Sequence, residues 1–191
     1  MSAFLGPIHF WLYNKIGKQE ELTAKIAAYA EQEGWIEDQS KYIKALPALQ
    51  DVIDESNIHG WLQTQIHDAE TRYAELTGKV MSDEHKAELH QLAFEYGKAN
   101  SIDQVSDPSA AYKAFDDFFV NGMPCDRVNT IVLESDDEVV WQMTRDIHAQ
   151  YWNDGSEAYY SLRNEIMRGM LEGTGLGLDT KDNTVYTIKR K

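Results

Sequence analysis

The spacing of apolar residues predicts helices over the first two thirds of the chain. The segment 7–16 follows Gly6 and is apolar on nearly every side. Pro7 suits the first turn of a helix, where its missing N–H would have no partner. We expect this helix to be buried among other elements or to form a subunit interface. Gly17 is expected to interrupt it, and an amphipathic helix is expected to continue over 20–32.

Further helical segments are predicted between residues 40 and 120. In the longest of them, apolar residues recur every three or four positions, which is the spacing of one helix face. Gly78 stands where such a helix usually ends. Ser82 is a good capping residue for the helix that follows. The expected ranges are 40–46 for a short turn of helix, then 51–77, 82–97 and 109–120.

The pattern changes after residue 122, and one stretch fits two structures. Residues 128–133 are rich in β-branched side chains, and 135–137 are typical of a turn. We therefore favour a hairpin whose second strand runs from Val139 to about Arg145. The same stretch also fits a helix, because four apolar residues fall on one helical stripe. They are Val140, Met143, Ile147 and Tyr151.

One more helix and one more strand are expected at the end of the chain. Ser156 follows a turn and can cap a helix whose apolar face extends to Leu171. Residues 173–177 are glycine-rich and are expected to be flexible, and 184–189 alternate as a strand. The predicted fold is α+β and mostly α: a bundle of four or five helices, followed by a small antiparallel sheet with one inserted helix.

Length, charge and cysteine content narrow the class of protein. The 191 residues suit a single domain, 1–191, with residue 122 as the best boundary between a helical part, 1–121, and an α+β part, 122–191. A formal net charge of −14 argues against nucleic acid as a partner, because the phosphates would be repelled. The single cysteine, Cys125, excludes an intramolecular disulfide and fits a cytoplasmic location. We expect no signal peptide and no membrane span.

Six histidines in an acidic chain indicate a metal site, since imidazole and carboxylate groups together bind zinc and iron. The strongest pair is Asp146 and His148, whose side chains share one face if their segment is extended. A metal needs further ligands from separate elements. The sequence therefore predicts a divalent transition metal, zinc or iron, bound by His9, Asp146 and His148, with further candidates in His59, His85 and Cys125.

The same residues have other interpretations. Asp146 could orient the His148 imidazole for acid–base catalysis, or the two could form a structural hydrogen-bonded pair. Arg163 lies in the middle of the apolar face of the last helix, where a buried guanidinium needs an anion. It is expected to pair with a carboxylate such as Asp146 or Asp126, to bind an anionic ligand, or to extend to the surface. The candidate catalytic residues are thus His148, Asp146 and Arg163.

Two other groups of histidines have weaker claims to a site. On the long predicted helix, Glu55, His59 and Glu70 lie within a sector about 60° wide beside the apolar stripe. Such a stripe could bind a metal in a bundle core, although no second helix offers a matching Glu and His pair. The alternative is a solvated helix edge. His85 is expected on an inward face, as a hydrogen-bonded core histidine or as a ligand.

Two segments resemble parts of small uncharacterised proteins of anaerobic microbes that are associated with metal binding. They are 4–13, with the sequence FLGPIHFWLY, and 144–148 together with Tyr151 and Trp152. The similarity covers these segments and little between them. It implies a role for His9 and His148. Such proteins often carry Cys at the position of Asp146, which would change the ligand set.

Two main hypotheses about function follow. The first is a soluble protein with a metal or small-ligand site built from histidine and carboxylate residues. The second is a non-enzymatic protein that forms a homodimer, or binds a partner, through its aromatic N-terminal helix. A third is an enzyme of small-molecule acid–base chemistry that uses Asp146, His148 and Arg163. It predicts stabilisation by an anionic ligand that depends on Arg163.

Overall fold

The computed structural model describes residues 4–153 and 155–191. That part of the chain forms six α-helices and one four-stranded antiparallel sheet, which confirms the α+β, mostly helical class. The helices are α1 (Pro7–Gln32), α2 (Leu49–Val52), α3 (Ile58–Val80), α4 (Lys86–Ala99), α5 (Pro108–Phe118) and α6 (Glu157–Met170). The strands are β1 (Asn129–Glu134), β2 (Glu138–Met143), β3 (Leu176–Lys181) and β4 (Val185–Arg190). Short 3-10 turns form η1 (Gln39–Tyr42), η2 (Pro124–Asp126) and η3 (Ala149–Tyr151).

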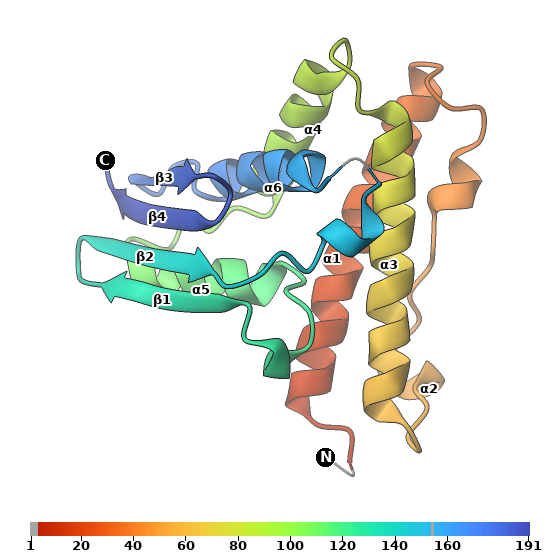
Figure 1. Cartoon of the computed structure of the whole chain (residues 1–191), viewed down its shortest axis with the longest axis horizontal. Helices are drawn as coiled ribbons and strands as arrows, with labels where there is room; N and C mark the ends of the chain where they lie inside the picture. The colour runs from red at the N-terminus through yellow and green to blue at the C-terminus, as the bar shows by residue number, and fades with distance from the viewer. Residues whose placement is uncertain (1–3, 154) are drawn as a thin grey trace.

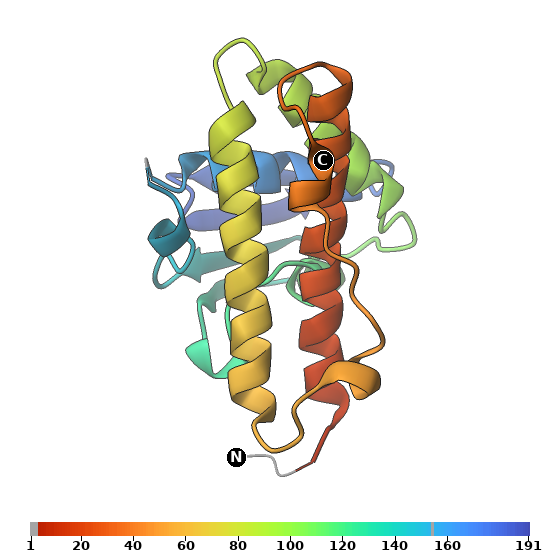
Figure 2. The same ribbon diagram turned by 90° about the vertical axis from the view of Figure 1, so that its right-hand side faces the viewer.

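The two longest helices, α1 and α3, lie side by side and run in the same direction (Figures 1 and 2). Residues 33–57, which include η1 and α2, connect the end of α1 to the start of α3. Contacts follow the parallel register: the rings of Tyr13 and Trp61 are 5.8 Å apart, and Arg72 donates to both carboxylate oxygens of Glu20 at 3.0 and 3.1 Å. This pair of helices forms one layer, and the sheet with α4, α5 and α6 lies beside it.

Helix α1 is continuous, so the predicted interruption at Gly17 is wrong. An internal glycine costs a helix roughly 1 kcal/mol. Ile16 and Leu22, on either side of it, are buried in the two hydrophobic clusters, and their packing outweighs that cost. The aromatic start of α1 is therefore largely part of the core rather than an exposed surface, although Ile8 and Phe10 remain exposed.

The boundaries of α3 also differ from the prediction. The helix begins at Ile58 and not near residue 51, because the Asn57 side chain caps it by accepting the Gly60 N–H at 3.2 Å. It also runs through Gly78 to Val80, so Gly78 does not end it. The residues from 49 to 52 form the separate turn α2.

The sheet has the order β1-β2-β4-β3, and it contains one strand that the sequence did not predict. β3 begins at Leu176, inside the stretch expected to be flexible, and pairs with β4. Residues 182–184 join the two strands, and Asp182 and Asn183 both have a φ of 52°. Consecutive left-handed residues are typical of the tight turns whose twist suits a hairpin. The strand is difficult to recognise because little of it is apolar.

Helices α5 and α6 lie against the buried face of the sheet (Figure 1). Trp141 of β2 and Tyr186 of β4 stack on this face with ring centroids 5.0 Å apart. α6 is also tied closely to α4 through two glycines. A Cβ atom on Gly97 would lie 2.1 Å from the Ile166 carbonyl oxygen, and one on Gly169 would lie 2.1 Å from that of Phe94. This close approach fixes the position of α6, which carries Arg163.

The buried apolar residues form two clusters. The larger one contains residues from both sides of position 122, such as Ile26 of α1 and Trp141 of β2. The smaller one lies between the N-terminal halves of α1 and α3 and includes Leu12 and Leu62. Within the described residues, the structure has no helix with the length and apolar character needed to cross a lipid bilayer.

Candidate functional site

The segment from Asp146 to His148 is a loop, so the strand expected to reach Arg145 ends earlier, at Met143. Asp146 folds back on this loop: its Oδ1 accepts the backbone N–H groups of His148 at 2.9 Å and Ala149 at 3.1 Å. Local bonds of this type compete with strand pairing and favour a turn. Asp146 therefore holds the backbone of His148 and does not contact its ring.

The Asp146 carboxylate also connects the loop to the start of α6. Ser156 donates a short hydrogen bond to it, and the Tyr160 hydroxyl donates another at 2.9 Å. Burial by itself raises the pKa of Asp146, but these bonds and those from the loop backbone outweigh burial and lower it. Asp146 is thus an ionised anchor that forms the wall of a shallow pocket with Tyr160 and Thr184.

The carboxylate that orients His148 is Glu70 of α3. The His148 Nδ1 lies 3.1 Å from both Glu70 oxygens, and both residues are buried, at 0% and 1% exposure. The imidazole stacks on Tyr159 with centroids 3.7 Å apart. Its Nε2 is buried and has no hydrogen-bond partner among the described residues. The role expected of Asp146, to orient the ring, is therefore taken by Glu70, a residue that the sequence placed on a helix edge.

His9 lies elsewhere, at the N-terminal ends of α1 and α3. Its Nδ1 accepts the Gly6 N–H at 2.9 Å, and its Nε2 is 3.4 Å from the Nε2 of His59. An Nδ1 that accepts a hydrogen bond leaves the proton of a neutral ring on Nε2, so His9 donates and His59 accepts. Glu70 follows His59 in α3 by 11 positions, which is about 16 Å at the rise of an α-helix. The structure thus does not bring His9 and His148 to one site.

The other candidate metal ligands are dispersed as well. The His85 ring stacks on Trp35 at 3.8 Å, and its Nδ1 is 3.0 Å from the Val80 carbonyl oxygen. Cys125 is exposed in η2. Among residues 4–153 and 155–191, no three His, Cys, Asp or Glu side chains converge on a point where they could hold a metal ion. The predicted metal bound by His9, Asp146 and His148 stays a prediction.

Arg163 has an unusual environment for a buried cation. It is 3% exposed, and no described carboxylate lies within 4.0 Å of it. The two expected partners are engaged elsewhere, because Asp126 binds Arg145 at 2.6 Å and Asp146 binds the start of α6. The predicted salt bridge of Arg163 is therefore absent from the described residues. An unpaired buried ion costs several kcal/mol.

The contacts that Arg163 does make are weak. The guanidinium carbon lies 5.0 Å from the Phe119 ring centroid and 5.6 Å from that of Tyr186. Nη1 is 3.5 Å from the Met143 sulfur, and Nε is buried with no hydrogen-bond partner in the described part of the chain. Cation–π contacts of this kind contribute about 0.5–2 kcal/mol each. They offset only part of the cost of burial, so the guanidinium retains its capacity to bind an anion.

Lys15 of α1 is a second buried cation in the same region. It is 2% exposed, its Nζ lies 3.8 Å from the Trp11 ring centroid, and no described carboxylate is within 4.0 Å. Burial lowers the pKa of Lys15 to about 8; the charge of Asp116 opposes this change, and that of Arg163 adds to it. Lys15 and Arg163 also line the same small cavity, so the two cations are near each other. Both charges thus lie in one low-dielectric region.

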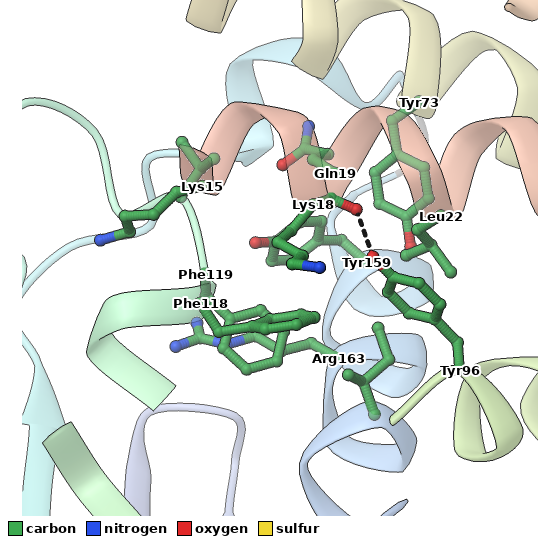
Figure 3. Close-up of a pocket in the computed structure, with 12 residues that line it drawn as sticks. Lys15, Lys18, Gln19, Leu22, Tyr73, Tyr96, Phe118, Phe119, Tyr159 and Arg163 are labelled. Atoms are coloured by element: carbon green, nitrogen blue, oxygen red, sulfur yellow. Dashed lines mark hydrogen bonds between the residues drawn. The ribbon is translucent and has the colours of Figure 1, made fainter. Parts of the chain in front are cut away.

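Two spaces lie beside these cations, and Lys15 lines both of them. The inner cavity is small, about 20 Å³, and lies between α1 and α6 with Tyr73, Tyr159 and Arg163 on its walls. A space of this size holds about one water molecule. Figure 3 shows the nitrogen ends of Lys15 and Arg163 pointing to the same side, away from Tyr96. Lys15 also lines a second space, the outer pocket.

The outer pocket has a volume of about 220 Å³ and lies between α1, α5 and the segment 121–129. Several of its polar groups have no partner among the described residues: both amide atoms of Asn121 and the Oδ1 of Asn129 are buried and unpaired. Buried polar groups are normally hydrogen-bonded, so unpaired ones indicate a position for a ligand or bound water. Its walls include Trp11, Lys15, Tyr112, Asp116, Asn121, Arg127 and Asn129.

Arg163 influences this pocket although it does not line it. Burial raises the pKa of the Tyr112 phenol, the charge of Asp116 raises it further, and that of Arg163 opposes the change. Lys15 lines both the outer pocket and the inner cavity, and Arg163 lines the inner cavity beside it. We call this arrangement the Lys15–Arg163 site.

Comparison with models of protein families, with curated protein sequences and with solved structures found no match to this chain.

The sequence indicated Arg163 but not Lys15 or Asn121. The signal for Lys15 was present, because it is the one charged residue between Phe10 and Ile16 in a helix predicted to be buried. A cation at such a position must be paired with an anion, have a lowered pKa, or take part in binding or catalysis. Asn121 precedes a glycine and resembled an ordinary helix end.

Proposed function

We propose that the protein binds a small organic anion at the Lys15–Arg163 site, with the negative group of the ligand directed toward the two cations. The observation that carries the proposal is the burial of Arg163 with no carboxylate partner among the described residues. Binding of a ligand carboxylate in this region would pair it with the uncompensated charge of Arg163. The low dielectric of the interior strengthens that attraction.

A carboxylate fits the groups present better than a more highly charged anion. The planar guanidinium of Arg163 matches the two oxygens of a carboxylate. Asp116 lines the same pocket and would repel a ligand with several negative charges. The free amide of Asn121 can donate to or accept from a polar group elsewhere on the ligand. These features favour a small monocarboxylate that carries another polar group.

The test is calorimetric binding and thermal stability of the dialysed protein with acetate, pyruvate, succinate and phosphate, at constant ionic strength. At a concentration of 100 times the Kd, a ligand stabilises its protein by about 2.7 kcal/mol, which raises the Tm of a chain of this size by roughly 5–10 °C. We expect this effect for at least one carboxylate. Arg163→Met should abolish it.

Arg168→Met is the matched control, because Arg168 is on the same helix but exposed and paired with Glu165. It should respond to the ligand as the wild type does. The proposal is overturned if none of these anions binds, or if Arg163→Met responds equally.

A second candidate function is self-association through α1. Ile8 and Phe10 are 48% and 38% exposed, which leaves part of the aromatic helix available to a second copy of the chain. The support is weaker, because Leu12 and Ile16 of the same helix are used inside the chain. Light scattering of the wild type and of an Ile8→Glu/Phe10→Glu variant tests it. A dimer that dissociates in the variant supports this function, and a monomeric wild type refutes it.

A further inference from the structure

Lys15 lines the outer pocket, and its amino group can act as a nucleophile when it is neutral and as a cation when it is protonated. Its side chain lies beside the inner cavity, and its amino end meets Trp11 and the outer pocket. An ordinary lysine is paired with a carboxylate or extends into solvent, whereas Lys15 is buried and has no carboxylate partner in the part of the chain that the structure describes. An amine held in an apolar, aromatic environment is the setting in which lysines react with carbonyl groups.

We propose that Lys15 forms an imine with a carbonyl compound that carries a carboxylate, such as a 2-oxo acid, with the carboxylate attracted by the charge of Arg163 in the neighbouring inner cavity. This inference rests on the proposed function, since the same ligand carboxylate occupies the Lys15–Arg163 site. The outer pocket, at about 220 Å³, is roughly ten times the volume that holds one water, so a ligand of several non-hydrogen atoms fits.

The reaction is balanced by the groups present. The neutral Lys15 amine attacks the carbonyl carbon of the ligand, and a C–N bond forms to give a carbinolamine. One amine proton moves to the carbonyl oxygen and makes it the hydroxyl group of the carbinolamine. Loss of this hydroxyl group together with the second amine proton releases one water and leaves a C=N bond. No oxidant or reductant is required. Asp116 lines the pocket and acts electrostatically on Lys15, so it is the group placed to transfer the proton that the departing hydroxyl needs.

Formation of the imine needs the unprotonated amine. Burial lowers the pKa of Lys15 to about 8, which leaves a substantial neutral fraction near neutral pH. The charged groups that act on Lys15 are Asp116 and Asp117 of α5, which favour the ammonium, and Arg163 of α6, which disfavours it. The yield of imine should therefore rise with pH up to about pH 9 and then level off.

The experiment traps the imine in the full-length protein. Pyruvate and sodium cyanoborohydride are added at about pH 8, near the Lys15 pKa, and the protein is analysed by intact mass and peptide mapping. We expect one reduced pyruvate per chain, located on Lys15, with no adduct at that position in Lys15→Met. Lys25→Met changes an exposed lysine of the same helix and should keep the adduct. Acetone, which lacks the carboxylate, should label Lys15 at least tenfold more slowly than pyruvate.

The outcomes separate this inference from the proposed function. If pyruvate binds in calorimetry through Arg163 but no adduct forms on Lys15, the imine is refuted and anion binding stands. If adducts are spread over exposed lysines at similar rates, the imine proposal is also refuted. If Lys15 is labelled equally by acetone and pyruvate, and Arg163→Met does not slow the reaction, the role of Arg163 in both proposals is overturned. Circular dichroism of each variant is the control that checks whether it is folded.

Discussion

The His148 Nδ1 lies 3.1 Å from both carboxylate oxygens of Glu70, a residue 78 positions earlier in the chain. This fully buried pair joins α3 to the loop that precedes α6. Together with the Asp146 bonds to Ser156 and Tyr160, it holds that loop against the helices. The geometry gives the pair a structural role, while Lys15 and Arg163 are buried with no carboxylate partner among the described residues.

We predict that Glu70→Leu lowers the free energy of unfolding by about 3–5 kcal/mol, since it leaves the His148 N–H buried without an acceptor. Glu70→Gln keeps an acceptor and should cost less. Glu165→Ala breaks the surface pair with Arg168 and serves as the control, with a loss of about 1 kcal/mol or less. Urea denaturation measures all three. A Glu70→Leu protein as stable as the control would contradict the structural role.

Adding His148→Phe to Glu70→Leu should recover part of the loss, because the orphaned N–H is then removed. An aromatic ring of similar shape keeps the stacking on Tyr159. A double variant that is less stable than the single variant would show that the imidazole makes further contacts.

The position of α6 depends on the two glycines at its contact with α4. Gly169→Ala should lower the free energy of unfolding by about 1–3 kcal/mol, since the new Cβ would lie 2.1 Å from the Phe94 carbonyl oxygen and force the helices apart. Gly78→Ala in α3 is the control, because a Cβ there meets nothing within 4 Å. It should be neutral or stabilising by up to about 1 kcal/mol. Thermal denaturation distinguishes the two, and equal effects would contradict the close packing.

Most of the fold follows from periodicity, and its exceptions have local causes. Helical stripes located α1, α3 and α4 because a helix face repeats along many residues. Helix ends are harder to predict. A single hydrogen bond to the Asn57 side chain sets the start of α3, and the two glycines expected to interrupt or end helices, Gly17 and Gly78, lie inside helices that packing stabilises. β3 was missed because its hydrogen bonds, and not its apolar content, hold it in the sheet.

The site could be predicted only in part. Arg163 stood out because a cation on an apolar face requires an explanation, and one of the alternatives was an anionic ligand. The pairing of His148 with Glu70 joins elements distant in sequence, and no local pattern fixes such a contact. The strand expected to run to about Arg145 ends at Met143, because the Asp146 carboxylate binds the loop backbone and stabilises a turn. Distances of this kind arise from tertiary packing alone.

Lys15 should make stability depend on alkaline pH. Its pKa of about 8 in the folded protein is below the value of 10.5 for an unperturbed lysine, so between these values the unfolded chain binds more protons. Stability therefore rises as pH increases through this range. Each tenfold change in proton affinity is worth about 1.4 kcal/mol, which gives roughly 3 kcal/mol in total.

Lys15→Met removes this contribution, so the difference in unfolding free energy between wild type and variant should shift by that amount between about pH 8 and pH 10.5. Lys25→Met should run parallel to the wild type. Urea denaturation at a series of pH values measures the difference, in which the titration of tyrosines cancels. A difference that does not change with pH would show that the Lys15 ammonium is not desolvated.

The most direct test of the account is the free energy of unfolding of the wild type and of Arg163→Met, each measured by urea denaturation without and with the carboxylate that stabilises the wild type most. In dialysed protein without ligand, the free energy of unfolding of the variant should be no more than about 1 kcal/mol below that of the wild type, because the variant removes a buried charge that has no carboxylate partner among the described residues. At a ligand concentration of 100 times the Kd, the wild type should gain about 2.7 kcal/mol and the variant nothing. If the variant is several kcal/mol less stable without ligand and gains as much from it as the wild type, Arg163 is a structural residue and the site does not bind an anion through it.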